Sequence, residues 1–180
     1  PALADSLSGD YVTALAAASP AFVFNTAAQQ VSTAQRRSLS HTARALALLN
    51  MAINDSLVTS FATKYHYDYW RPETAIRAGA SDGNDKTEGD PNFAPLILTP
   101  CFPSYPSNHA SGSYGGADIL ERIYGAGRHA ITLTGTVAGS PITFQYSKFS
   151  QITDDIDDAR VYGGIHFRFD QEVGAHQGRQ

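Results

Sequence analysis

The chain reads SHTARALALLNMAINDSLVTSFATKYHYDYWRP from residue 40 to residue 72, and this stretch decides the fold. Its large apolar residues recur at steps of three and four positions: they are Leu46, Leu49, Ile53, Leu57 and Phe61. This spacing keeps them on one face of an α-helix of about six turns. We therefore expect a central helix that begins near Ser40 and runs into Lys64.

The rest of the chain predicts an all-α fold, a helical bundle around this central segment. Residues 10–35 should form one or two amphipathic helices with a break at Pro20, because proline suits the first turn of a helix and not its interior. Further helices are expected over residues 108–124, over residues 149–159, and from about residue 167 onward.

Other stretches predict a hairpin, a loop and a close helix contact. Alternating residues within 131–146 indicate a short, peripheral β-hairpin, and the Gly/Asp/Asn-rich residues 79–92 indicate a surface loop. The helix expected over 108–124 is rich in glycine and alanine, and each interior glycine costs it about 1 kcal/mol. We therefore expect another part of the chain to approach its backbone closely.

The composition predicts one water-soluble domain, residues 1–180. The chain is 42% hydrophobic and 17% charged, and its net charge of −4 offers no basic surface to nucleic acid or to an anionic membrane. No run approaches the roughly 18 apolar residues of a membrane span, and the first residues contain no signal peptide, which leaves the compartment open. The one cysteine excludes an internal disulfide.

The first candidate for chemistry is the pair Lys64 and Arg71 in KYHYDYWRP. Seven residues are nearly two helical turns, so we expect both cations on one helical face, with Pro72 ending or kinking the helix. A solvated pair on an exposed turn is the simpler alternative. Aromatic neighbours favour a buried setting, where a bound anion would stabilise the cations. These neighbours are Tyr65, Tyr67, Tyr69 and Trp70.

The second candidate is YPSNHA, residues 105–110, directly before a predicted helix. Helix N-termini expose N–H groups and carry partial positive charge. The Ser107 hydroxyl and the amides of Asn108 and His109 could therefore bind a tetrahedral anion, on which His109 could act as acid or base. A plain N-cap with an uninvolved histidine explains this motif alone equally well.

The third candidate is ARVYGGIHFRFD, residues 159–170. Arg160 continues an apolar helix face, so it should point inward, where a guanidinium needs a partner such as an oxyanion. His166 and Asp170 are one helical turn apart, so the carboxylate can hold one ring nitrogen and raise the basicity of the other. A capping histidine with an i,i+4 salt bridge is the alternative.

In this order, the three motifs resemble the signature of the vanadium-dependent haloperoxidase and type 2 phosphatidic acid phosphatase superfamily: K-x6-R-P, then P-S-G-H, then S-R-x5-H-x3-D. The match covers roughly residues 40–175 and is most similar to the soluble bacterial haloperoxidase-like branch. Asn108 departs from the signature's glycine, and Ala159 from its serine. The chain is short for a haloperoxidase, which suggests the C-terminal catalytic part of a longer family chain or a processed form.

The resemblance implies the haloperoxidase helical fold, vanadate as the cofactor, and a set of site residues. His166 would be the ligand to vanadium, and His109 the acid–base residue for incoming hydrogen peroxide. Lys64 would polarise the peroxide, Asp170 would support the histidine ligand, and Phe102 would line a halide pocket. The residues that would hold the vanadate oxygens are Lys64, Arg71, Ser107, Asn108, Arg160 and His166. The catalytic set would be His109, His166, Lys64 and Asp170.

The implied activity is the oxidation of a halide by hydrogen peroxide to hypohalous acid, which would halogenate a small organic acceptor, in a secreted or periplasmic protein. The same site can bind phosphate and hydrolyse phosphate esters, with His166 attacking phosphorus and His109 protonating the leaving alcohol. A helical module that binds phosphate without catalysis is a third interpretation. Apolar area left exposed by a missing N-terminal region would favour a homodimer.

Overall fold

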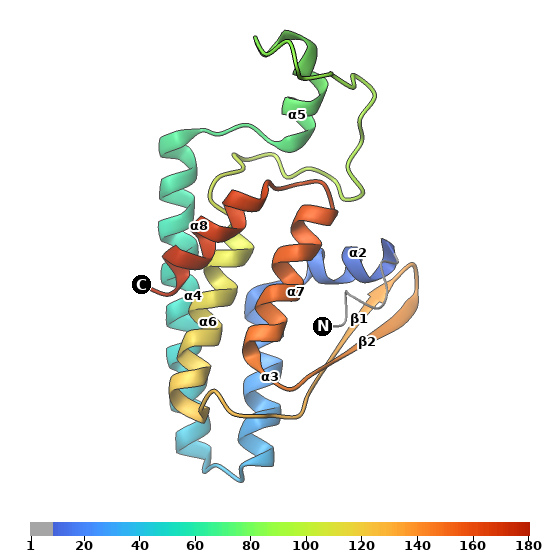
Figure 1. Cartoon of the computed structure of the whole chain (residues 1–180). Coiled ribbons are helices and arrows are strands. Elements are labelled where there is room, and N and C mark those ends of the chain that lie inside the picture. The colour runs from blue at the N-terminus through green and yellow to red at the C-terminus, as the bar shows by residue number, and fades with distance from the viewer. Residues whose placement is uncertain (1–8) are drawn as a thin grey trace.

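The computed structural model describes residues 9–180 and shows a helical bundle flanked by one two-stranded antiparallel sheet (Figure 1). The α-helices are α2 (Gly9–Ala17), α3 (Pro20–Ala34), α4 (Leu39–Tyr67), α5 (Pro72–Arg77), α6 (Asn108–Tyr124), α7 (Phe149–Tyr162) and α8 (Arg168–Gly178). The strands are β1 (Ile131–Val137) and β2 (Ser140–Tyr146), and a 3₁₀ turn, η1, covers Gly79–Ser81. The predicted fold class is confirmed.

The central helix α4 is the longest element, with 29 residues. It begins after Ser38, whose side chain accepts a hydrogen bond from the His41 amide at 3.2 Å, as an N-cap does. Leu49 and Ile53 of its predicted apolar face are buried. Phe61 of the same face is 37% exposed, because it lies near the end of the helix. The central helix is therefore confirmed, and it continues one turn beyond the predicted bounds.

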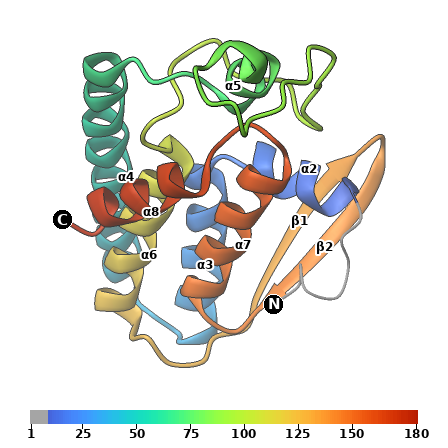
Figure 2. The same ribbon diagram turned by 45° about the horizontal axis from the view of Figure 1, so that its top comes forward.

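The bundle is built from α3, α4, α6 and α7, which lie side by side, while α8 crosses over α6 at one end (Figure 2). The break predicted at Pro20 is present, since α2 and α3 meet there at 90°. Side chains from all four bundle helices meet in one apolar core. Its fully buried members include Phe24, Leu49, Leu120, Ile152 and Ile156.

The small residues of α6 allow the close contact that the sequence predicts. A Cβ on Gly115 would stand 2.5 Å from the Ser56 hydroxyl oxygen of α4, and one on Gly116 would stand 3.3 Å from Ile53 Cδ1. On its other side α6 contacts α8, where a Cβ on Gly178 would meet the α6 backbone. Glycine is needed on α6 because its neighbours pack directly against its backbone.

The hairpin pairs β1 with β2 in the register Ile131↔Tyr146 to Val137↔Ser140. It lies beside α2 and α3 at the edge of the bundle (Figure 2), so its predicted peripheral position is confirmed. Its packing is not peripheral, however, because Ile131, Leu133, Phe144 and Tyr146 are buried in the main core.

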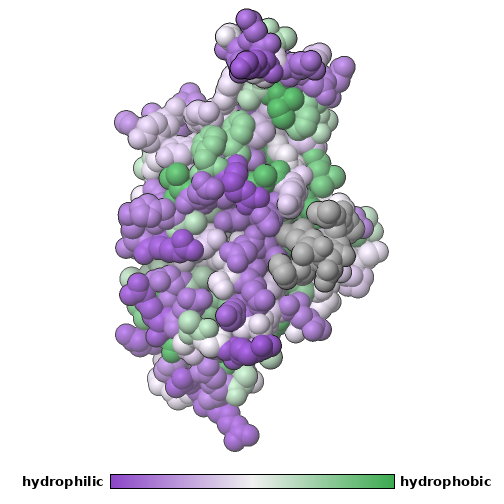
Figure 3. Space-filling view, in the orientation of Figure 1, coloured by the Kyte–Doolittle hydropathy of each residue, from purple (hydrophilic) through white to green (hydrophobic). Residues whose placement is uncertain are grey.

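Residues 79–92 form the predicted surface loop and, with α5, cover one end of the bundle (Figure 1). In Figure 3, hydrophobic side chains gather on this face at that end, between α8 and α5, while hydrophilic side chains cover most of the bundle below.

The segment Leu39–Arg77, which contains α4, has the length and composition of a helix that could cross a membrane. Its most apolar window has a mean hydropathy of 1.3, and 28% of that window is buried. The expectation that no window approaches a membrane span is corrected to this extent, although core helices of soluble proteins can have the same length and composition. Much of this apolar helix therefore lies at the surface.

Candidate active site

Lys64 is the last buried residue of α4, and its side chain is fully buried. Its Nζ donates hydrogen bonds to the backbone oxygens of Pro103 at 2.8 Å and Ser104 at 2.7 Å. Burial, together with the nearby charge of Arg71, lowers the pKa of Lys64 to about 7, whereas Asp170 acts in the opposite direction. The cation is thus aimed at the loop that precedes α6.

Arg71 reaches the same place by a route that the helical spacing did not predict. α4 ends at Tyr67 because Asp68 takes the left-handed conformation, with φ 45°, and Arg71 is the N-cap of α5. The expectation that Lys64 and Arg71 share one helical face was therefore wrong, and Pro72 begins a helix, where its fixed φ suits the first turn, and does not end one.

The side chain of Arg71 is buried by contacts from both sides of the site. Its Nη1 donates to the backbone oxygen of Ile165 at 2.7 Å and lies 3.1 Å from Nε2 of His166, while its Nε donates to the oxygen of Phe102 at 3.0 Å. Burial lowers the pKa of Arg71 to about 10. The buried setting was expected from the neighbouring aromatic residues, but Tyr65, Tyr67, Tyr69 and Trp70 are themselves exposed.

Phe102 forms a face of the site. Its ring centroid lies 5.4 Å from Nζ of Lys64 and 5.1 Å from Cζ of Arg71, within the range of cation–π attraction. The ring also packs edge-on against Phe61 of α4. The structure thus places Phe102 beside the two cations, whereas its expected role in lining a halide pocket stays a prediction.

His166 precedes α8, after a turn in which Gly164 adopts a φ of 76° that a side chain would strain. Oδ2 of Asp170 accepts hydrogen bonds from the Phe167 amide at 3.1 Å and from the Ser104 hydroxyl at 2.5 Å. The carboxyl group is therefore an acceptor, so Nδ1 of His166, at 2.8 Å from the same oxygen, is the donor. This leaves the lone pair on Nε2, on the side of Arg71.

The pKa values of this pair follow from their burial. The pKa of His166 is well below its usual value because burial disfavours the imidazolium, and the charges of Arg160 and Arg71 act in the same direction. Burial raises the pKa of Asp170, opposed by the hydrogen bonds from Ser104 and Phe167. A neutral His166 with a lone pair on Nε2 is suited to bind a metal centre or attack an electrophile.

The α6 terminus supplies the second motif, and Ser107 is its N-cap. The Ser107 hydroxyl accepts from the Ala110 amide at 3.2 Å, and the Ser107 amide donates to the backbone carbonyl oxygen of Asp170 at 2.9 Å. The side chain of Asn108 is turned toward α4, where its Oδ1 accepts from the fully buried Ser60 hydroxyl. The extra side chain at this position is thus used for helix packing.

His109 stands in the first turn of α6. Burial lowers its pKa to about 3, and the charges of Arg160, Lys64 and Arg71 act in the same direction, in that order. His109 therefore lies within the field of all three cations.

Arg160 points inward from α7, as its place on the apolar face predicts. Nη1 donates to the backbone oxygen of Ala16 at 2.6 Å, whereas Nε has no hydrogen-bond partner among residues 9–180. Burial, together with the charge of Arg71, lowers the pKa of Arg160 to about 9. A buried guanidinium with an unused N–H is poorly satisfied by protein groups alone.

The three motifs therefore converge on one cluster of positive charge: Lys64, Arg71 and Arg160 lower one another's pKa or that of the two histidines. Asp170, the carboxylate that acts on both Lys64 and Arg71, is already engaged by three donors. An oxyanion fits this arrangement, because it brings negative charge and several acceptors. A bare metal cation does not, since no group of three His, Cys, Asp or Glu side chains in the described part of the chain could ligate one.

Ser104 is a site residue that the sequence interpretation missed. It is fully buried, contacts Lys64 through its carbonyl and Asp170 through its hydroxyl, and lies 3.3 Å from Nδ1 of His166. The one available signal was its place two residues before Pro106, next to the second motif.

Comparison with known proteins identifies the family. The family model described as VCPO second helical-bundle domain matches residues 44–180. The chain belongs to this family. The match takes in all three motifs and confirms the resemblance to the vanadium haloperoxidases.

Individual relatives in the vanadium haloperoxidase family agree. Vanadium chloroperoxidase of Curvularia inaequalis is 37% identical over 90 residues, which are 46% of this chain and 14% of that protein. A bacterial vanadium-dependent iodoperoxidase has a similar fold, with a TM-score of 0.78 and 23% identity over 98% of this chain and 42% of its own. A holo-type bacterial vanadium-dependent chloroperoxidase has a similar fold with a TM-score of 0.68. It is 16% identical in sequence, over 95% of this chain and 44% of its own. The chain thus spans less than half of each of these relatives.

Proposed function

We propose that the chain carries the oxyanion site of a vanadate-dependent haloperoxidase that oxidises halide with hydrogen peroxide. The observation that carries this proposal is the convergence of Lys64, Arg71 and Arg160 on the Nε2 side of a buried, neutral His166, whose Nε2 accepts a hydrogen bond from Nη1 of Arg71. Family membership supports it, and the relatives described above are vanadium enzymes by name. The site residues are proposed on their geometry and on the motifs.

Vanadate fits the residues that are present. His166 Nε2 would be its ligand, and the three cations with the α6 N-terminus at Ser107 would hold its oxygens. Vanadate, when bound, supplies the Lewis-acid centre that makes hydrogen peroxide reactive toward a halide. The part of the chain is to hold that centre in a fixed, positively charged cavity.

The charged groups change when an anion binds. Without it, burial and the neighbouring cations lower the pKa of Lys64 to about 7 and that of His109 to about 3. A bound oxyanion raises both pKa values by direct charge attraction. His109 then lies closer to the range in which it can accept a proton from peroxide and return it, and Lys64 remains charged at neutral pH.

Phosphate-ester hydrolysis is the second candidate, and the position of His166 favours it as well. An imidazole whose Nδ1 is held by a carboxylate is an activated nucleophile at Nε2, once the Arg71 Nη1 that donates to Nε2 turns to the phosphoryl oxygens. The three cations would stabilise the phosphoryl oxygens, and His109 would protonate the leaving alcohol.

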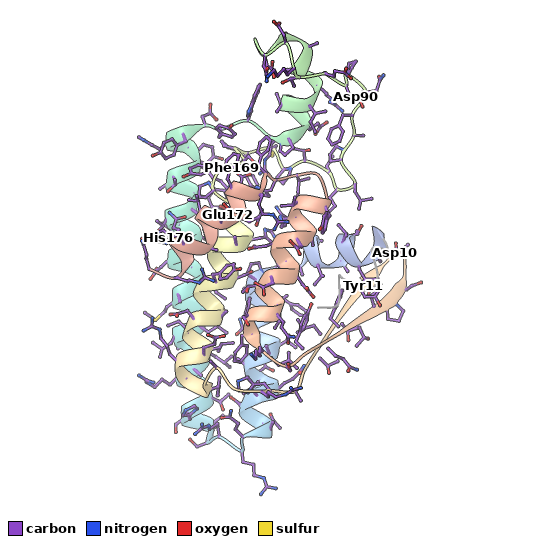
Figure 4. The ribbon with its side chains drawn as sticks, viewed as in Figure 1. Asp10, Tyr11, Asp90, Phe169, Glu172 and His176 are labelled. Atoms are coloured by element: carbon purple, nitrogen blue, oxygen red, sulfur yellow. The ribbon has the colours of Figure 1, made fainter. Side chains whose placement is uncertain are left out.

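Parallel assays separate the two functions. Halogenation of monochlorodimedone is measured with peroxide, orthovanadate and each halide, and hydrolysis of p-nitrophenyl phosphate is measured without vanadate. We expect vanadate-dependent halogenation, lost in His166→Ala and retained in His176→Ala, which changes a histidine on the outer face of α8 (Figure 4). Phosphatase activity without halogenation in vanadate-loaded protein would contradict the first proposal. Failure of both anions to raise the melting temperature would favour the non-catalytic module.

A further inference from the structure

The helices α4 and α6 lie side by side and run in opposite directions (Figure 1), and among the described residues one side-chain hydrogen bond joins them. The Ser60 hydroxyl of α4 donates to Oδ1 of Asn108, the first residue of α6, at 2.5 Å. Both residues are buried, Ser60 completely. The hydroxyls of Ser56, Thr59 and Thr63 in the same part of α4 donate instead to the carbonyl oxygen four residues earlier in their own helix. Ser60 thus differs from its neighbours, because its bond crosses to the other helix.

The close contacts along the rest of this helix pair involve glycines of α6. A Cβ on Gly112 would stand 3.5 Å from Leu57 Cδ2, and one on Gly116 would stand 3.3 Å from Ile53 Cδ1. Apolar contact of this kind is non-directional, so it sets the distance between the helices more than their relative position along the axis. A hydrogen bond weakens steeply when it bends. The bond from Ser60 therefore fixes the position of α6 along α4.

This position matters because each helix carries part of the candidate site beside the bond. Lys64 follows Ser60 by one turn on the buried face of α4, and Ser107 and His109 flank Asn108 at the start of α6. A shift of α6 along α4 would change the distance between the Lys64 cation and the α6 N-terminus. It would thereby change the fit of an oxyanion held by both.

We propose that Ser60 is a positioning residue of the oxyanion site: through Asn108 it holds the α6 N-terminus at the distance from Lys64 at which one oxyanion contacts both. The proposal rests on the oxyanion site proposed above, but not on which reaction that site carries out. It also gives a role to the asparagine that stands in place of the signature's glycine, since a glycine offers Ser60 no side-chain acceptor.

Isothermal titration calorimetry with vanadate and with phosphate tests the proposal without turnover. Ser60→Ala removes the donor, so α6 no longer stays in the position that binds the anion, and the affinity for both anions should fall by about three- to tenfold. Ser56→Ala is the matched control, because that hydroxyl bonds within α4, and it should bind both anions as the wild type does. An unchanged affinity in Ser60→Ala, or an equal loss in Ser56→Ala, would overturn the proposal.

A double-mutant cycle with Asn108→Gly separates positioning from a general loss of stability. Asn108→Gly removes the acceptor and keeps the backbone N–H groups of α6, so it should weaken anion binding about as much as Ser60→Ala does. In the double variant the two losses should not multiply, because both substitutions break the same bond. Losses that multiply would show that Ser60 does not act through Asn108.

Nuclear magnetic resonance follows the position of α6 directly in the anion-free protein. The backbone amides of Asn108, His109 and Ala110 should show microsecond-to-millisecond exchange in Ser60→Ala, and none in the wild type or in Ser56→Ala. Absence of this exchange in Ser60→Ala would contradict the positioning role.

The wild type separates this proposal from the proposed activity. Anion binding that depends on Ser60, in a protein that does not halogenate, would support the positioning role and contradict the haloperoxidase activity. A wild type that binds neither vanadate nor phosphate would overturn the positioning role together with the oxyanion site.

Discussion

Replacing Ser104 with alanine removes one of the three donors that hold Oδ2 of Asp170. A hydrogen bond to a charged group contributes about 1.5–3 kcal/mol, and about 1.4 kcal/mol corresponds to a factor of ten in affinity. The Asp170 carboxylate of the variant holds the His166 ring less firmly. We therefore expect vanadate affinity, measured by isothermal titration calorimetry, to fall between about tenfold and a hundredfold.

The matched control is Ser111→Ala, which removes another fully buried serine of the same region whose hydroxyl donates to Gln177, away from the cations. Both variants should lower the melting temperature, but Ser104→Ala alone should weaken vanadate binding. If Ser104→Ala binds vanadate as the wild type does, the serine has only a structural role and the reasoning about Asp170 fails.

Three further predictions follow from the site and its packing. With the Lys64 pKa near 7 in the anion-free protein, sulfate affinity should be flat below pH 7 and fall about tenfold per pH unit above it, since binding then takes up a proton; a flat calorimetric profile up to pH 9 would contradict this. Gly174→Ala should lower the free energy of unfolding, measured by urea titration, by about 1–3 kcal/mol, because its Cβ would stand 2.6 Å from the backbone oxygen of Ser107. Gly127→Ala is the control and should leave the free energy of unfolding nearly unchanged, because a Cβ at that position meets no other atom. Phe102→Ala removes the ring from both cations and should change the ratio of kcat/KM values among halides; an unchanged ratio would exclude a halide role.

Local sequence signals predicted the helices well, because each depends on residues close together in the chain. The apolar period of α4, the serine and glycine at the ends of α6, and the proline between α2 and α3 all act within one or two turns. The hairpin was predicted for the same reason. The burial of its side chains was not predicted, because this burial depends on contacts with α2 and α3, which are far away in sequence.

Most residues of the candidate site were named from the sequence, but the way the chain brings them together was not. The spacing of Lys64 and Arg71 suggested one helix, but Asp68 ends that helix and an extended segment carries Arg71 to the same loop. Sequence spacing cannot distinguish these routes, since both bring the two cations together. Ser104 was missed because its role depends on Asp170, 66 positions away.

The bond from Arg160 to the Ala16 carbonyl joins residues 144 positions apart and places the guanidinium at the C-terminal end of α2. A helix C-terminus carries partial negative charge, so α2 serves as a built-in counterion that neither diffuses away nor needs to be displaced. It balances part of the arginine's charge while leaving Nε unused. Arg160 is therefore held in a fixed orientation, and an anion that bound there would meet a cation that does not have to reorganise.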